Sequence, residues 1–406
     1  MRYSKAIISA GLWSVMAITN AQAQGSPVSE GTAGEARGIA SYWTPERMAD
    51  AKPMPVPKVI VDALSLASPP ASEASGELAM PGYVRGCPPN ASNCDPTPRT
   101  LSSQDAFSSE SAAYGDLLQP MHGTKPINPL SGPYGPFQRW REANAITAYP
   151  KSTIGKLFFT LNGRNFVCSA SAIGRSTLIT AGHCNSDGAT HFATNRLFCP
   201  SFNGAPDPTR DCWSVVTSAV SFQWHNSGNP DYDYSCLVTA TTGRKVANKI
   251  GNVTGWLGRA WNFTASQAER TFGYPQAAPF TGGTLQTTAS TDWYTHDFVL
   301  GGQISKVIGS DLTGGSSGGP WILGWTGGLA ETADTDGSIA TDPGNNWVNG
   351  VNSHKRCLVN CATPPTATNG VFWQEMTSPP FSNTATDNNE SEDVITICLA
   401  NANNNP

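Results

Sequence analysis

Short apolar and β-branched runs, separated by Gly, Asn and Pro, fill the chain from about Ala145 onward. The clearest pair is Lys156–Leu161 and Arg164–Ile173. Between them stands Asn162-Gly163, which supplies the positive φ angles that a two-residue hairpin turn requires. Further runs of this kind are Ser176–Thr180, Val215–Phe222, Tyr234–Thr239 and Trp321–Leu323. Long helical periodicity is absent, apart from a short helix expected near Glu392–Ala400. The pattern predicts an all-β domain over residues 146–406.

The preceding part of the chain has a different pattern. Residues 24–140 hold 17 of the 31 prolines and show little hydrophobic periodicity, as in Lys52–Pro57. Proline removes a backbone donor and fixes φ, so regular sheet or helix is not expected across most of this region. We therefore expect residues 24–145 to form an irregular proline-rich pro-segment or spacer. Cys87 and Cys94 stand only seven residues apart and would close a small local loop there.

The first 23 residues have the layout of a secretory signal peptide. A basic start, Met1–Lys5, precedes an apolar run from Ala6 to about Thr19 and the small-x-small site that ends at Ala23. The run is too short to span a bilayer comfortably, and no later apolar stretch reaches spanning length. We expect a secreted protein, extracellular or periplasmic, without stable membrane insertion.

Composition narrows the class of protein further. Ten cysteines in an exported chain indicate disulfides rather than thiol chemistry or zinc. The net charge is −5 and no Lys/Arg block occurs, so nucleic acid is not an expected partner. His122, His191, His225 and His296 show no metal-ligand spacing, and we expect neither a metal nor an organic cofactor.

Three segments carry the candidate chemistry. Thr180–Cys184 places His183 beside a half-cystine, and Gly315–Pro320 places Ser317 on a glycine-rich turn. A serine hydroxyl needs a histidine to take its proton and a buried acid to orient that histidine. We expect His183 to be the base and Ser317 the nucleophile, with the backbone N–H groups of Gly315 and Ser317 forming an oxyanion hole.

Two aspartates between these segments compete for the role of the acid. Asp233 precedes Tyr234 and an apolar strand, whereas Asp231 follows Asn229-Pro230 and is typical of a loop. We favour Asp233, because the acid should be buried and anchored by a strand. In an extended segment both side chains would point the same way, so alternation does not separate them.

The chain order His183, Asp233, Ser317, with these flanking residues, resembles the chymotrypsin-like (trypsin-like) serine peptidases, most of all their bacterial glutamyl-endopeptidase branch. The resemblance covers roughly residues 150–375. It implies two packed antiparallel β-barrels with the active site between them, and a monomer that hydrolyses protein or peptide substrates. It also implies a disulfide between Cys168 and Cys184 that closes the histidine loop.

The remaining cysteines are less determined. We expect Cys199 and Cys212 to close a local loop. The pairing among the other four stays open at this point, because spacing does not decide it: Cys236, Cys357, Cys361 and Cys398.

Substrate preference also stays open. Asp311 stands six residues before Ser317, where an acid selects Arg or Lys in trypsin-like members, yet an aspartate there also occurs in glutamyl-endopeptidase-like sequences. We expect Asn352, Ser353 and His354 to line one wall of the pocket. Glutamate-cleaving members usually carry histidine directly after a Gly-aliphatic pair, and here that position is Asn352.

Activation is expected to differ from that of trypsin-like zymogens. The chain shows no Ile-Val-Gly-Gly start, and the residue before the nucleophile is Ser316 rather than the aspartate that would receive a new N-terminal amine. We therefore expect removal of the proline-rich segment to control maturation of the zymogen.

Two other readings compete with a secreted serine endopeptidase. Gly315–Gly319 also fits the G-x-S-x-G pattern of α/β-hydrolases, but their acid and histidine follow the serine, and here only His354 does. A catalytically weak or inactive binding or adhesion module would usually lack a triad member, whereas all three are present.

Overall fold

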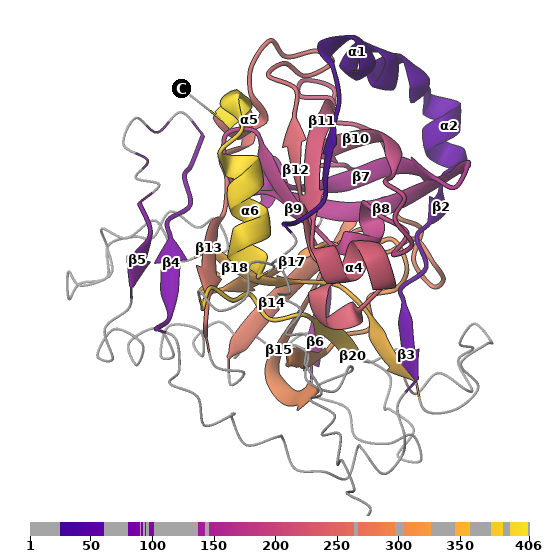
Figure 1. Ribbon diagram of the computed structural model, residues 1–406. Helices are drawn as coiled ribbons and strands as arrows, with labels where there is room; N and C mark the ends of the chain where they lie inside the picture. Colours follow the sequence, from indigo (N-terminus) through magenta and orange to yellow (C-terminus); the bar gives the residue numbers. More distant parts are fainter. Residues whose placement is uncertain are drawn as a thin grey trace, which may run out of the picture.

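The fold is known from a computed structural model, in which β-strands dominate (Figure 1). The described residues are 25–60, 80–89, 91, 94, 97–100, 137–142, 146–263, 267–296, 304–325, 346–357, 375–384 and 390–404. The predicted signal peptide, residues 1–23, lies outside them.

The first barrel is a closed ring of six antiparallel strands. In ring order they are β11 (Trp213–Val220), β10 (Thr194–Pro200), β7 (Ile154–Leu161), β8 (Arg164–Ala172), β9 (Thr177–Thr180) and β12 (Ser235–Thr239). Direct pairing of β11 with β12 closes the ring. The predicted hairpin is confirmed: β7 and β8 pair from Ile154–Ser171 to Leu161–Arg164, and Asn162 and Gly163 both have positive φ.

The second sheet forms the other half of the fold. Its main path is β20 (Glu375–Ser378), β16 (Ser305–Gly309), β15 (Leu285–His296), β14 (Ala268–Gly273), β17 (Pro320–Leu323) and β18 (Trp347–Val351). The segment that follows β18 pairs with β20 through the bridge between His354 and Thr377, so the two ends of this path lie together. The predicted all-β double barrel is therefore confirmed, and the candidate site lies where the two halves meet.

The region before residue 145 contains more regular structure than its proline content predicted. Residues 25–60 form β1 (Val28–Glu30), α1 (Ala33–Tyr42), α2 (Pro45–Asp50), β2 (Lys52–Pro53) and β3 (Lys58–Ile60). Tertiary burial explains the difference, because Trp43 and Met48 join the hydrophobic core of the first barrel.

Strand pairing also crosses the domain boundary expected at residue 145. β6 (Phe137–Glu142) pairs antiparallel with β15 along its full length. β4 (Gly82–Val84) pairs with β5 (Arg99–Thr100) and with β13 (Gly258–Trp261). Strands of the expected pro-segment thus pair with strands of residues 146–406.

The expected short helix near the C-terminus is confirmed as α6 (Ser391–Leu399). It begins with a capping box between Glu390 and Asp393, and its buried face packs along β11 and β12. A disulfide between Cys236 and Cys398 fastens the helix to β12. Cys361 and the side chain of Cys357 lie outside the described residues.

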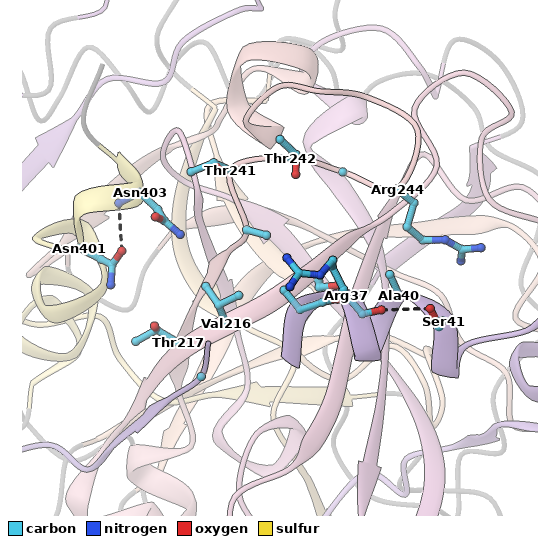
Figure 2. A pocket seen from close by; sticks show the side chains of 15 residues that line it. Arg37, Ala40, Ser41, Val216, Thr217, Thr241, Thr242, Arg244, Asn401 and Asn403 are labelled. Carbon is cyan, nitrogen blue, oxygen red and sulfur yellow. Dashed lines mark hydrogen bonds between the residues drawn. The ribbon is translucent and has the colours of Figure 1, made fainter. Parts of the chain in front are cut away.

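A surface pocket of about 730 Å³ lies on the first barrel, between α1, β11 and the segments around residues 241–244 and 401–403 (Figure 2). None of the candidate site residues lines it. Among the described residues, no helix is long and apolar enough to cross a membrane.

We expect loss of the Cys236–Cys398 disulfide to lower stability more than loss of Cys199–Cys212. The first closes a loop of 162 residues and the second a loop of 13. The chain-entropy relation then gives about 5 and about 3 kcal/mol, respectively. Urea unfolding of the double serine variants would measure both. A larger loss for the Cys199–Cys212 pair would contradict the expectation.

Candidate active site

Pairing between β9 and β12 brings His183 and Asp233 together. Thr180 at the end of β9 lies opposite Ser235 at the start of β12, so the segments beyond these two ends are neighbours. His183 lies in the short 3-10 helix Gly182–Cys184. Its Nδ1 lies 2.7 Å from Asp233 Oδ2, and its backbone N–H donates to Asp233 Oδ1 at 2.7 Å. Both side chains are buried.

The carboxyl of Asp233 is held ionised in this buried place. Burial raises the pKa of this carboxyl. The charge of His183 and the hydrogen bonds from His183 and Ser353 together lower it by more, so the net pKa lies below the usual value. Because the pKa is lowered in the folded state, the ionised carboxyl stabilises the fold at neutral pH. This stabilisation is lost only as pH falls through the lowered pKa.

Asp231 occupies a different environment. It lies in the 3-10 helix Pro230–Tyr232, where the chain is not extended, so the two aspartates do not share a face. Asp231 accepts a hydrogen bond from Ser305 Oγ at 2.8 Å, which links the first barrel to β16. Of the two candidates, the structure brings Asp233 to His183.

The turn that carries Ser317 packs against the strand end that leads to His183. The N–H of Ser169 in β8 donates to the Ser317 carbonyl at 2.7 Å. A Cβ on Gly318 would lie 2.0 Å from Thr180 Oγ1. Among the described residues, neither Ser317 Oγ nor His183 Nε2 has a hydrogen-bond partner, although both atoms are buried. Buried polar atoms without a hydrogen-bond partner are rare in folded proteins, and a catalytic role is one of the explanations for them.

Gly315 has a φ of +98°, a conformation that favours glycine, and a Cβ there would also meet the Tyr274 carbonyl at 2.7 Å. Its N–H, one of the two expected oxyanion donors, donates to the carbonyl of Met54 at 3.3 Å. This donor is therefore engaged by a segment from the N-terminal region.

Ser169 is a contact that sequence reasoning missed. Its Oγ donates to the Gly315 carbonyl at 3.0 Å and accepts from the Tyr274 N–H at 2.9 Å. With the bond from its N–H to Ser317, it fixes the nucleophile turn at two points. Its position directly after Cys168 was the one signal in the sequence, and it does not reveal a contact with a turn nearly 150 residues away.

The structure places Asn352 differently from the expected pocket wall. Its amide nitrogen donates to the carbonyls of Phe272 and Ser316 at 2.8 and 3.0 Å, while its backbone pairs with Gly318 and Gly319. The side chain is fully buried. Asn352 thus holds the nucleophile turn against β14, and its amide faces protein groups rather than an open pocket.

Ser353 is likewise buried, and its hydroxyl donates to Asp233 Oδ2 and contacts His354 Nδ1 at 2.7 Å. Since Ser353 belongs to the second half of the fold, it joins that half to the acid of the first. His354 is buried beside it and pairs with Thr377 of β20.

Asp311 is paired within the chain. Arg139 Nε of β6 lies 3.0 Å from its Oδ2. Burial raises the pKa of Asp311, although the cations of Arg139 and Lys355 lower it in part. Burial also lowers the pKa of Lys355 to about 7, against the opposing charges of Asp311 and Glu375. Arg139 therefore already pairs with the acid that would select a basic substrate side chain.

Disulfides brace the histidine segment. Cys168 pairs with Cys184, which joins β8 to the turn that carries His183. Cys199 pairs with Cys212, and Cys87 with Cys94. Sulfur and nitrogen atoms of Cys168, His183 and Cys184 lie close enough to hold a metal ion, but the disulfide leaves no thiolate to act as a ligand.

A comparison with curated proteins agrees with the resemblance that the motifs indicate. No family model matches the chain. The chain is 27% identical over 282 residues to a glutamyl endopeptidase of Bacillus licheniformis. The match covers 61% of this chain and 80% of the relative.

Similar solved structures include a thermostable serine protease from an extremophilic microorganism and a protease of Arthrobacter nicotinovorans. Each is 28% identical to this chain and covers 62% of it. The match covers 98% of the first protein's own chain and 97% of the second's, and the TM-scores are 0.47 and 0.46, respectively.

We expect Gly319→Ala to disrupt the nucleophile turn. A Cβ at Gly319 would lie 1.8 Å from the Phe272 carbonyl, so backbone must move, at a cost of about 3 kcal/mol or more. Gly38→Ala in α1 is the matched control, because nothing lies within 4 Å of its Cβ and Ala favours a helix. Chemical denaturation would compare them, and equal stability of the two variants would contradict the expectation.

Proposed function

We propose that this chain, a serine-type endopeptidase related to the bacterial glutamyl-endopeptidase branch of the chymotrypsin-like peptidases, cleaves proteins through an acyl-enzyme formed on Ser317. Its Oγ attacks the carbonyl carbon of the scissile bond while His183 Nε2 takes the hydroxyl proton. Asp233 orients the imidazole and stabilises the imidazolium that results.

The second half of the reaction returns the proton. The imidazolium of His183 protonates the leaving amine, which departs and leaves the acyl group on Ser317. Water then attacks the ester carbonyl as His183 again takes a proton, and the imidazolium gives this proton to Ser317 Oγ as the acid product leaves. The N–H groups of Gly315 and Ser317 would stabilise the negative oxygen of each tetrahedral intermediate, at about 3 kcal/mol for one donor.

The pairing of His183 with Asp233 carries this proposal. The 2.7 Å contact between His183 Nδ1 and Asp233 Oδ2 favours the tautomer with its proton on Nδ1, so Nε2 is left with a lone pair to accept a proton. Neither His183 Nε2 nor Ser317 Oγ has a hydrogen-bond partner among the described residues, although both atoms are buried, so no other group holds the two atoms that would exchange a proton.

We further propose that the enzyme is exported and made as a precursor. The basic and apolar start of the chain, with a small-x-small site at Ala23, is typical of a secretory signal. Four disulfides among the described residues suit an oxidising compartment. Its substrates are then proteins and peptides outside the cytoplasm.

Ser317→Ala tests the nucleophile. We expect the proteolytically matured protein to react covalently with a fluorophosphonate and to hydrolyse casein, and the variant to lose labelling and about a million-fold in turnover. Mass spectrometry of the labelled peptide would locate the adduct. Labelling of Ser317→Ala at the rate of the unsubstituted protein would overturn the assignment.

Asp233→Asn and Asp231→Asn form a matched pair that tests the acid. We expect the first to lower kcat about 10⁴-fold, because an amide favours the wrong imidazole tautomer. The second keeps an oxygen that can accept from Ser305 Oγ, so kcat should stay within a few-fold of the starting value. Steady-state hydrolysis of a peptide substrate would measure both, and the reverse ranking would assign the role to Asp231.

A further inference from the structure

A proline-alternating segment of the N-terminal region crosses the candidate active site. Residues 52–57 read Lys-Pro-Met-Pro-Val-Pro, and together with Ala51 and β3 we call residues 51–60 the strap. In Figure 1 the indigo chain descends from α2 through β2 to β3, passing from the first barrel to the second. Alternating prolines hold such a segment extended before it binds, so little conformational entropy is lost on docking.

The first contact engages the proposed oxyanion donor. The N–H of Met54 donates to the Val167 carbonyl in β8 at 2.9 Å, which sets the strap beside the Cys168–Cys184 disulfide. The Met54 carbonyl then accepts from the N–H of Gly315 at 3.3 Å. A protein carbonyl of the strap thus takes a hydrogen bond that a substrate carbonyl would need.

The second contact is apolar. Val56 is 5% exposed and belongs to a hydrophobic cluster with Ile308, Leu312, Trp321 and Met376. Leu312 directly follows Asp311, the residue expected at the base of the specificity pocket. The strap therefore inserts a side chain next to the proposed pocket, where a substrate side chain would pack.

The third contact covers the edge of a strand beside the triad. β19 (Lys355–Cys357) begins two residues after Ser353, whose hydroxyl binds Asp233. The N–H of Lys355 donates to the Pro57 carbonyl at 3.0 Å, and β3 pairs in parallel with β19 from Lys58–Lys355 to Ile60–Cys357. Extended peptides bind to enzymes by adding to such an edge, and here the strap has taken it.

The strap is anchored on its N-terminal side. Ala51 is fully buried, and its carbonyl accepts from Gln276 Nε2 at 2.8 Å. Just upstream, Trp43 is buried in the first barrel and its Nε1 donates to the Asn195 carbonyl. A tether of this kind gives the strap a high effective concentration at the cleft.

We propose that residues 51–60 are a built-in inhibitor that occupies the substrate cleft, so that the full chain is latent until the strap is displaced or cut away. This proposal rests on the active site described under the proposed function. It assigns the inhibitory role to a named stretch within the 122-residue region expected to be a pro-segment, and to three contacts within that stretch.

The full-length protein and its variants test the proposal through the rate of fluorophosphonate labelling. Val56→Asp places a carboxylate in the apolar cluster and should speed labelling of Ser317 at least tenfold. Val28→Asp is the matched control, because Val28 lies in the same N-terminal region but is 42% exposed on β1, away from the cleft. Its labelling rate should equal that of the unsubstituted protein.

A second variant keeps the test valid if Val56→Asp misfolds. The double substitution Pro55→Gly with Pro57→Gly loosens the strap without adding a charge, and should speed labelling several-fold. A synthetic peptide of residues 51–60 should in turn slow the labelling of Val56→Asp, and a scrambled peptide should not. Circular dichroism would verify that each variant is folded.

The outcomes separate the two proposals. If the full chain, Val56→Asp and the double glycine variant all label Ser317 at one rate, the strap is not an inhibitor, and the proposed function stands. If no variant labels above the level of Ser317→Ala, and proteolytic maturation does not change this, the proposed function itself fails. Faster labelling of both strap variants with an unchanged control supports the inference.

Discussion

The buried carboxylate of Asp233 is the constraint on which the centre of this molecule depends. An isolated charge of this kind would be expensive to remove from water, and here three donors compensate it: the backbone N–H and Nδ1 of His183, and the hydroxyl of Ser353. Two donors come from the first barrel and one from the second half. The arrangement therefore stabilises the interface between the halves as well as the orientation of the imidazole.

Close backbone contacts hold the nucleophile turn at the same interface. Gly318 faces Thr180 and Ser169 of the first barrel, whereas Gly319 faces Phe272 of the second half. The amide of Asn352 and the hydroxyl of Ser169 bind the turn from opposite sides. Ser317 is thus fixed by groups that lie outside the proposed triad, and a catalytic site requires rigid support of this kind.

Local chemistry made part of the fold predictable. Asn162-Gly163 could be recognised as a turn because its conformation is set by two adjacent residues, and α6 because its apolar face repeats within nine residues. The motifs around His183 and Ser317 were visible for the same reason. By contrast, the role of Asn352 and the choice of Cys398 as the partner of Cys236 depend on segments brought together only by folding.

The N-terminal region shows how composition alone can mislead. Thr32 and Glu35 form a capping box at the start of α1, and Thr44-Pro45 begins α2, so local helix signals were present. The sequence prediction rested on the proline content and did not use these signals. Burial of Trp43 against the barrel, which no local pattern reveals, explains why these short helices are stable.

The disulfide between Cys236 and Cys398 closes a covalent ring that contains β13 to β20 and Ser317. Cys236 also stands three residues after Asp233. The ring can close only after the segment bearing Ser317 has been synthesised. Its oxidation is therefore a late step of biogenesis, and it joins the strand next to Asp233 to the C-terminal helix.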